Sequence, residues 1–266
     1  MIPRILFFIF IYIPMMLIGI PTQFIVTRLG LEWNFMPRLF HKCGCIFLGM
    51  KVRVIGEPAH GRPTLLTSNH ISWTDIIAIG SVADVTFVAK AEIKRWPFVN
   101  FMASLQKTIF VDYNRRSDTR RTHAEMASRL MRNSAVLLFA EGHRDLGTHV
   151  QPFRSALVGA AQAAMKEAGA LDVAIQPVTI AYTRLQGMPI SRADRGLVSG
   201  IGSKGFKKVV RDLLTSGTKD VTVAFGVPYP ITATDDRKKL TRVAEGDVRH
   251  MLVALNRNLP LPKVTA

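Results

Sequence analysis

The chain has 266 residues, enough for one domain with a substantial core and a smaller appendage. Its 35 basic and 19 acidic residues give a net charge of +16, which indicates an anionic partner such as nucleic acid or a membrane surface. Because 48% of the residues are hydrophobic and the basic residues form no compact arm, nucleic acid is disfavoured. Membrane lipids are therefore the expected partner.

An uncharged, strongly apolar segment runs from Ile5 to Val26 and is long enough for the roughly 30 Å hydrocarbon core of a bilayer. Pro14, Gly19 and Pro21 interrupt it, so a broken or re-entrant element fits as well, and a straight spanning helix is not expected. A cleaved signal peptide is disfavoured, because Arg4 alone makes a thin basic region. The Lys and Arg residues beyond this segment predict a body on the cytoplasmic face of the inner membrane.

Residues 31–50 form a second apolar, helix-like stretch. Its two interpretations are core packing and membrane docking, and docking is favoured because the stretch directly follows the first apolar segment. Cys43 and Cys45 are too close in sequence for an unstrained mutual disulfide and lack the spaced partners of a zinc site. We therefore expect residues 1–50 to anchor the chain and residues 51–266 to form the main domain.

From residue 51 the sequence alternates between strand-like and helix-like segments. The expected strands are 52–55, 64–67, 85–89, 108–111, 135–140, 173–182 and 221–227. The expected helices are 73–80, 91–105, 117–131, 155–167 and 235–256. This alternation predicts an α/β fold, a mixed sheet flanked by helices, attached to an N-terminal hydrophobic helical membrane anchor. Residues 183–220 are expected to be irregular.

The stretch Asn69-His-Ile-Ser-Trp-Thr-Asp75 lies where a buried strand turns into a helix. Ser72 is the expected N-cap, and Asp75, three positions later, can reach back to free backbone N–H groups. His70 and Asp75 would lie about 140° apart on a continuous helix, so their side chains meet only if His70 precedes the helix. A carboxylate on one imidazole nitrogen leaves the other free to accept a proton, as a general base requires.

Simple helix capping with an ordinary turn histidine is the plainer interpretation of this stretch alone. Two further segments favour chemistry. Residues 137–144 form a buried strand that ends in Glu141, Gly142 and Arg144, where the glycine permits close backbone approach and the guanidinium suits phosphate. Lys90 follows the strand at 85–89 and, with Arg115 and Arg116, could complete an anion site, although the two arginines also fit a solvated basic face.

Together these segments resemble the glycerolipid acyltransferases related to bacterial 1-acylglycerol-3-phosphate acyltransferase. Their N-H-x-S-x-x-D block matches residues 69–75, their A-K-x-E block matches residues 89–93, and their F-P-E-G-T-R-S block is similar to residues 139–145. Here Ala140 replaces the proline, His143 the threonine and Asp145 the serine. The similarity covers roughly residues 50–185, and the departures affect the expected headgroup more than the expected reaction.

The resemblance implies that His70, oriented by Asp75, removes the proton from a lysolipid hydroxyl as its oxygen attacks the thioester of acyl-CoA or acyl carrier protein. The reaction implied by the resemblance needs no metal, no cofactor and no acyl-enzyme intermediate. The implied substrate-binding residues are Asn69, Ser72, Lys90, Arg116, Glu141, Gly142 and Arg144. The expected acceptor is 1-acylglycerol-3-phosphate, which would give phosphatidic acid.

Two other interpretations remain open. The departures, together with residues 151–161, also resemble enzymes that O-acylate lyso-ornithine lipid, whose acceptor carries no phosphate. From another class, residues 200–205 satisfy a G-x-G-x-x-G pattern, which raises a nucleotide-binding protein, but no clear strand precedes it and no acidic residue follows at the required distance. A catalytically inactive, lipid-binding membrane protein is the remaining alternative.

Overall fold

The computed structural model describes residues 2–31, 34–111, 128, 135–155, 158–159, 162, 173–201, 206–232 and 235–262. Its helices are α1 (Ile2–Phe7), the π-helical η1 (Phe8–Tyr12), α2 (Ile13–Arg28), α3 (Phe35–Leu48), α4 (Thr74–Val82), the 3-10 helix η2 (Ala91–Arg95), α5 (Pro97–Leu105), α8 (Arg195–Ser199), α9 (Phe206–Thr215) and α10 (Arg237–Asn256). Its strands are β1 (Met50–Ile55), β2 (Thr64–Ser68), β3 (Val85–Lys90), β4 (Ile109–Val111), β5 (Ala135–Phe139), β6 (Val173–Leu185), β7 (Met188–Pro189), β8 (Lys219–Phe225) and β9 (Tyr229–Ile231).

The described strands form one mixed sheet in the order β1-β8-β6-β2-β5-β3-β4, with β7 and β9 also paired to β6. The inner strands β6, β2, β5 and β3 run parallel, whereas β8 pairs antiparallel with β6. In the register, Ser68 of β2 stands beside Phe139 of β5 and Val178 of β6. The carboxyl ends of β2 and β5 therefore meet at one edge of the sheet.

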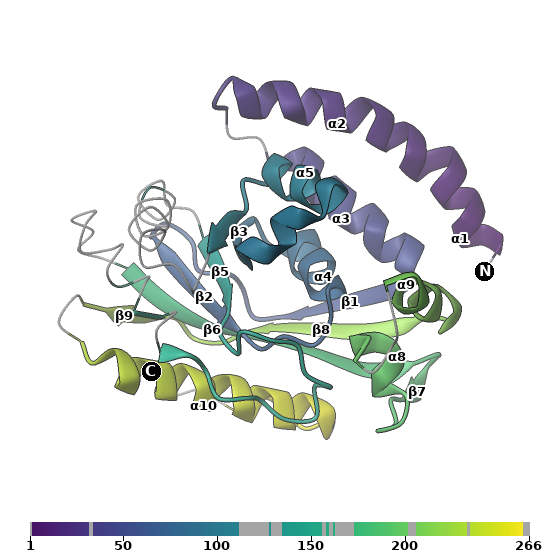
Figure 1. Cartoon of the computed structure of the whole chain (residues 1–266). Helices are drawn as coiled ribbons and strands as arrows, with labels where there is room; N and C mark the ends of the chain where they lie inside the picture. Colours follow the sequence, from purple (N-terminus) through teal and green to yellow (C-terminus); the bar gives the residue numbers. More distant parts are fainter. Residues whose placement is uncertain are drawn as a thin grey trace.

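Helices cover both faces of this sheet, which confirms the predicted architecture (Figure 1). Side chains alternate between the faces of a strand, so neighbouring leucines of β2 enter different cores. Leu65 packs in the core on the face that Ala244 of α10 covers. Leu66 packs on the other face with Cys45 of α3 and Ile79 of α4. The interpretation of residues 31–50 as core packing therefore holds for the buried face of α3.

The N-terminal apolar segment is helical without a break from Ile2 to Arg28, and it arches over α3 and α5 as an outer layer (Figure 1). By length and composition this helix could cross a membrane. The expectation that the prolines interrupt it is wrong, since the helix continues through Pro14, which follows the π-helical turn η1, and through Pro21 inside α2. A missing backbone N–H is tolerated best where neighbouring groups or a local π-helical adjustment compensate for it.

The expectation that residues 183–220 are irregular is also wrong, because this region contains β7, α8 and α9. In α9 the buried Val209 and Leu213 are four positions apart, whereas Lys207 and Arg211 are exposed. This is the pattern of a surface helix with one apolar stripe. The predicted helices at 117–131 and 155–167 lie largely outside the described residues, and Ser128, Ser155, Val158 and Gln162 are helical.

Candidate active site

The structure brings His70 and Asp75 together at the carboxyl end of β2. Their side chains are joined by a hydrogen bond of 2.9 Å between Nδ1 of His70 and Oδ2 of Asp75. His70 lies in the turn between Ser68, where β2 ends, and Thr74, where α4 begins. This placement ahead of the helix lets two residues that are five apart face each other.

Asp75 is fully buried, and both of its carboxylate oxygens accept hydrogen bonds. Oδ2 also accepts from the backbone N–H of Ile71 at 2.7 Å and of Ser72 at 2.9 Å, and Oδ1 accepts from the Tyr182 hydroxyl at 2.8 Å. The carboxylate thus satisfies backbone donors ahead of the helix, as in a capping box, and has one fixed orientation. That orientation holds the His70 ring in place.

Ser72 is not the N-cap that the sequence suggested, because the N-cap is Trp73 and α4 begins at Thr74. The Ser72 hydroxyl is fully buried and accepts from the Thr74 hydroxyl at 3.0 Å. Asn69 is equally enclosed, since its side-chain amide donates to the Ile180 carbonyl at 3.0 Å and accepts from the Ile180 N–H at 2.9 Å. Both side chains therefore bind the protein itself: Ser72 bonds to Thr74 at the start of α4, and Asn69 holds the turn against β6.

The His70 ring stacks on Phe139, with ring centroids 4.0 Å apart, and its side chain is 17% exposed. Because Nδ1 donates to a carboxylate, the tautomer with a lone pair on Nε2 is favoured. No hydrogen bond to Nε2 occurs among the residues that the structure describes. This nitrogen is thus available to a proton on a substrate.

Tyr182 is a member of this site that the sequence did not indicate. It is fully buried on β6, and its hydroxyl lies 2.7 Å from the Thr74 hydroxyl as well as against Asp75. Burial and the neighbouring Asp75 carboxylate raise the pKa of Tyr182 well above its usual value, so the hydroxyl stays a donor. The sequence did contain one signal for this role, a tyrosine in a mostly apolar strand, because a buried tyrosine hydroxyl needs a hydrogen-bond partner.

Glu141 lies at the end of β5 and is 1% exposed. One oxygen accepts from the backbone N–H of His70 at 2.6 Å, and the other accepts from the backbone N–H of Gln151 at 2.8 Å. Burial raises the pKa of Glu141 to about 8, with Asp145 and Asp75 adding to the effect and the two N–H donors opposing it. Both oxygens are used within the protein, so the geometry favours a positioning role over headgroup contact.

Of the remaining predicted site residues, Lys90, Gly142 and Arg144 lie around the same edge. Arg144 is exposed, with Nη1 3.4 Å from the Ser199 carbonyl, and Lys90 is exposed at the end of β3. Gly142 has a φ of 73°, and a Cβ there would come within 2.7 Å of Nε of Arg154. Arg116 lies outside the described residues. Arg154 is an exposed cation beside this turn that the sequence did not single out.

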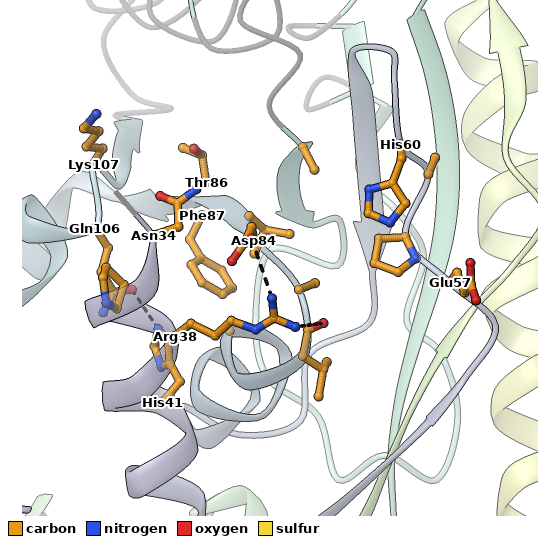
Figure 2. A pocket seen from close by; sticks show the side chains of 18 of the residues that line it. Asn34, Arg38, His41, Glu57, His60, Asp84, Thr86, Phe87, Gln106 and Lys107 are labelled. Carbon is orange, nitrogen blue, oxygen red and sulfur yellow. Dashed lines mark hydrogen bonds and ion pairs between the residues drawn. The ribbon is translucent and has the colours of Figure 1, made fainter. Parts of the chain in front are cut away.

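A separate cavity of about 630 Å³ lies at the opposite, amino edge of β2, β3 and β5, and His70 does not line it (Figure 2). On one wall Arg38 points to Asp84, with a 3.8 Å ion pair, and Nε2 of His41 lies 3.1 Å from Gln106, while Glu57 and His60 occupy the other side. Burial lowers the pKa of His41 to about 4, so its ring is neutral at physiological pH. Among the described residues, no group of His, Cys, Asp or Glu is placed to hold a metal ion.

The chain is similar to known acyltransferases. Residues 51–181 match the family model described as Acyltransferase. Lyso-ornithine lipid O-acyltransferase from Brucella abortus is 42% identical over 244 residues, which cover 91% of this chain and 91% of that protein. The chain belongs to the acyltransferase family.

Two other comparisons extend this result. Lyso-ornithine lipid O-acyltransferase from Rhizobium meliloti is 35% identical to this acyltransferase over 89% of the chain and 81% of that protein. The crystal structure of the 1-acyl-sn-glycerophosphate (LPA) acyltransferase PlsC from Thermotoga maritima matches with a TM-score of 0.59 over 84% of the chain and 79% of that chain. At 21% identity this likeness supports the fold alone.

Proposed function

We propose that this acyltransferase transfers a fatty acyl chain to the free hydroxyl of a lyso-ornithine lipid, with His70 as general base oriented by Asp75. The acyl donor is acyl-CoA or acyl carrier protein. The observation that carries the reaction is the 2.9 Å contact between Nδ1 of His70 and the buried Asp75 carboxylate. The named activity of the relatives from Brucella abortus and Rhizobium meliloti supports the acceptor.

In the proposed reaction, Nε2 of His70 takes the proton from the acceptor hydroxyl as that oxygen attacks the thioester carbonyl. A C–O bond forms, the C–S bond breaks, and the imidazolium returns the proton to the departing thiolate. The Asp75 carboxylate stabilises the positive charge that His70 carries in between. Proton transfer by a positioned base contributes about 10² to 10⁴ to the rate.

The second candidate acceptor is 1-acylglycerol-3-phosphate, which requires the same base. The exposed Arg144 guanidinium beside the site is suited to bind a phosphate. In addition, 1-acyl-sn-glycerol-3-phosphate acyltransferase from Neisseria gonorrhoeae is 35% identical over 105 residues, or 39% of this chain and 41% of that protein. This similarity spans less of the chain, so we place this acceptor second.

Membrane attachment through the helix Ile2–Arg28 fits this function, because Phe10 of η1 and Leu17 and Ile18 of α2 each expose about 70% of their surface. Anionic headgroups would also attract a chain with a net charge of +16. In this proposal residues 1–50 anchor the protein at the cytoplasmic face of the inner membrane, and residues 51–266 form the acyltransferase domain. The alternative nucleotide-binding pattern is preceded by the helix α8 where a strand is required, and residues 202–205 lie outside the described part.

The test is an acyl-transfer assay of the purified full chain with one labelled acyl donor and either lysolipid as acceptor. Turnover with lyso-ornithine lipid and little with 1-acylglycerol-3-phosphate is the expected result, and the reverse preference would overturn the proposed acceptor. His70→Ala should abolish transfer to both acceptors while the protein still sediments with vesicles. Wild-type turnover by a folded His70→Ala protein would rule out the general-base assignment.

A further inference from the structure

The loop from residue 141 to 151 binds the main chain of His70 on both sides. Besides the Glu141 bond to the His70 N–H, the backbone N–H of Asp145 donates to the His70 carbonyl at 2.8 Å. Arg195 holds the loop by donating to the Gly147 carbonyl at 2.9 Å, and Asn256 of α10 donates to the same carbonyl at 2.9 Å. Asp145 therefore has a fixed position next to the general base.

In the described part of the chain, the carboxylate of Asp145 has no permanent cation as its partner. Among the described residues, neither a lysine nor an arginine forms an ion pair with it, and the nearest basic group is the His149 ring at 3.9 Å. Its oxygens accept from the Gly147 N–H at 3.2 Å and from Nε2 of Gln151 at 2.8 Å. A carboxylate has about four acceptor positions, so this leaves capacity for a further donor.

The Asp145 carboxylate is shielded from most of the solvent, although no lysine or arginine of the described residues is paired with it. The Asp145 side chain is only 17% exposed, whereas the chain as a whole carries 35 basic residues. A largely buried carboxylate is stabilised best by a charged hydrogen-bond donor. The local chemistry therefore favours a ligand that brings its own positive charge.

We propose that Asp145 binds the ammonium group of the acceptor headgroup, which makes it the residue that selects ornithine over phosphate. This inference rests on the proposed lyso-ornithine acceptor. An ornithine headgroup that is attached through one amino group keeps one ammonium and one carboxylate. Asp145 and the adjacent Arg144 offer the matching pair of opposite charges.

The same arrangement disfavours the phosphate-bearing acceptor. Arg144 attracts phosphate and carboxylate alike, so it cannot choose between the two lysolipids. The Asp145 carboxylate would repel a phosphate bound to Arg144, whereas it attracts the ornithine ammonium. Specificity of this kind combines an attraction for one ligand with a repulsion against its competitor.

The experiment measures KM and kcat for two acceptors, lyso-ornithine lipid and the same lipid with its free amino group acetylated, so that only the positive charge is lost. Wild-type protein should show a KM about 10- to 100-fold higher for the acetylated acceptor, with a smaller change in kcat, as expected for loss of a charged hydrogen bond. Asp145→Asn should raise KM for the unmodified acceptor by a similar factor. It should then no longer distinguish the two lipids.

Asp84→Asn is the matched control, because Asp84 lies at the opposite edge of the sheet and pairs with Arg38. If Asp145→Asn discriminates between the two lipids as strongly as the wild type, the assignment of Asp145 is wrong while the proposed acceptor stands. If wild-type protein fails to acylate lyso-ornithine lipid but acylates 1-acylglycerol-3-phosphate, the proposed function itself is wrong. The acetylated lipid keeps the test valid even if Asp145→Asn perturbs the loop.

Discussion

Asp75→Asn should reduce turnover by an intermediate factor, because the structure predicts that the new amide keeps its oxygen on His70. The Oδ2 position accepts from two fixed backbone donors, the N–H groups of Ile71 and Ser72, as well as from His70. An amide NH2 group in that position would face these donors without an acceptor. The amide nitrogen should instead take the Oδ1 position and donate to the Tyr182 hydroxyl.

The expected loss in rate then comes from removing the negative charge while the imidazole tautomer is preserved. Exchanging a charged acceptor for a neutral one weakens a hydrogen bond by about 1 to 2 kcal/mol. A full charge about 4 Å from the imidazolium is worth about 4 kcal/mol at an effective dielectric constant near 20. A loss of about 2 to 4 kcal/mol of transition-state stabilisation corresponds to a kcat about 30- to 1000-fold below that of the wild type.

The assay is transfer of a labelled acyl group at saturating donor and acceptor, with the thermal midpoint of each variant as the check on folding. Asp84→Asn makes the same chemical change at the far edge of the sheet and should retain wild-type kcat. An unchanged kcat in Asp75→Asn would show that the Asp75 charge does not assist the reaction. A loss as complete as that of His70→Ala would show that the amide has turned its NH2 group toward the ring.

Two further predictions concern the residues that support this pair. Tyr182→Phe should destabilise the protein by about 2 kcal/mol, because it removes the hydroxyl that bonds to Oδ1 of the buried Asp75. The thermal midpoint should then fall by about 4 to 8 °C, and an unchanged midpoint would contradict this prediction. Glu141→Gln should reveal the pKa of Glu141, which burial raises from 4.5 to about 8. Because the folded state holds that proton more tightly, the wild type should lose stability relative to Glu141→Gln as pH rises from about 4.5 to about 8. If the thermal midpoints of wild type and Glu141→Gln differ by the same amount at every pH between about 5 and about 9, the pKa of Glu141 is not raised.

The sheet and the contact between His70 and Asp75 could be predicted because their signals are local. The apolar run at 64–67 and the cap-like residues after it identify a strand that turns into a helix. The five-residue spacing then requires His70 to lie before the helix if the side chains are to meet. The match of this stretch to a known block added the reaction type.

The partners of Asn69, Glu141 and Tyr182 could not be predicted, because each bonds to a group that is distant in sequence or belongs to the main chain. Asn69 binds the backbone of Ile180, which is 111 residues away. Glu141 accepts hydrogen bonds from the backbone N–H groups of His70 and Gln151. Every residue except proline has such a group, so the sequence does not show which ones Glu141 contacts. Pro21 lacks a backbone N–H, and the sequence alone does not show that helix α2 continues through it.

The main chain of His70 joins acceptor recognition to proton transfer. Its N–H donates to Glu141 and its carbonyl accepts from Asp145, so the loop proposed to bind the headgroup also sets the height of the imidazole above the sheet. A shift of about 1 Å in a reacting group can cost two orders of magnitude in rate. Substitutions that move the backbone of this loop should therefore change kcat, whereas those that alter only the Asp145 charge should act on KM. The two effects separate because the side chain of His70 is the proposed base, whereas its peptide groups bind the loop.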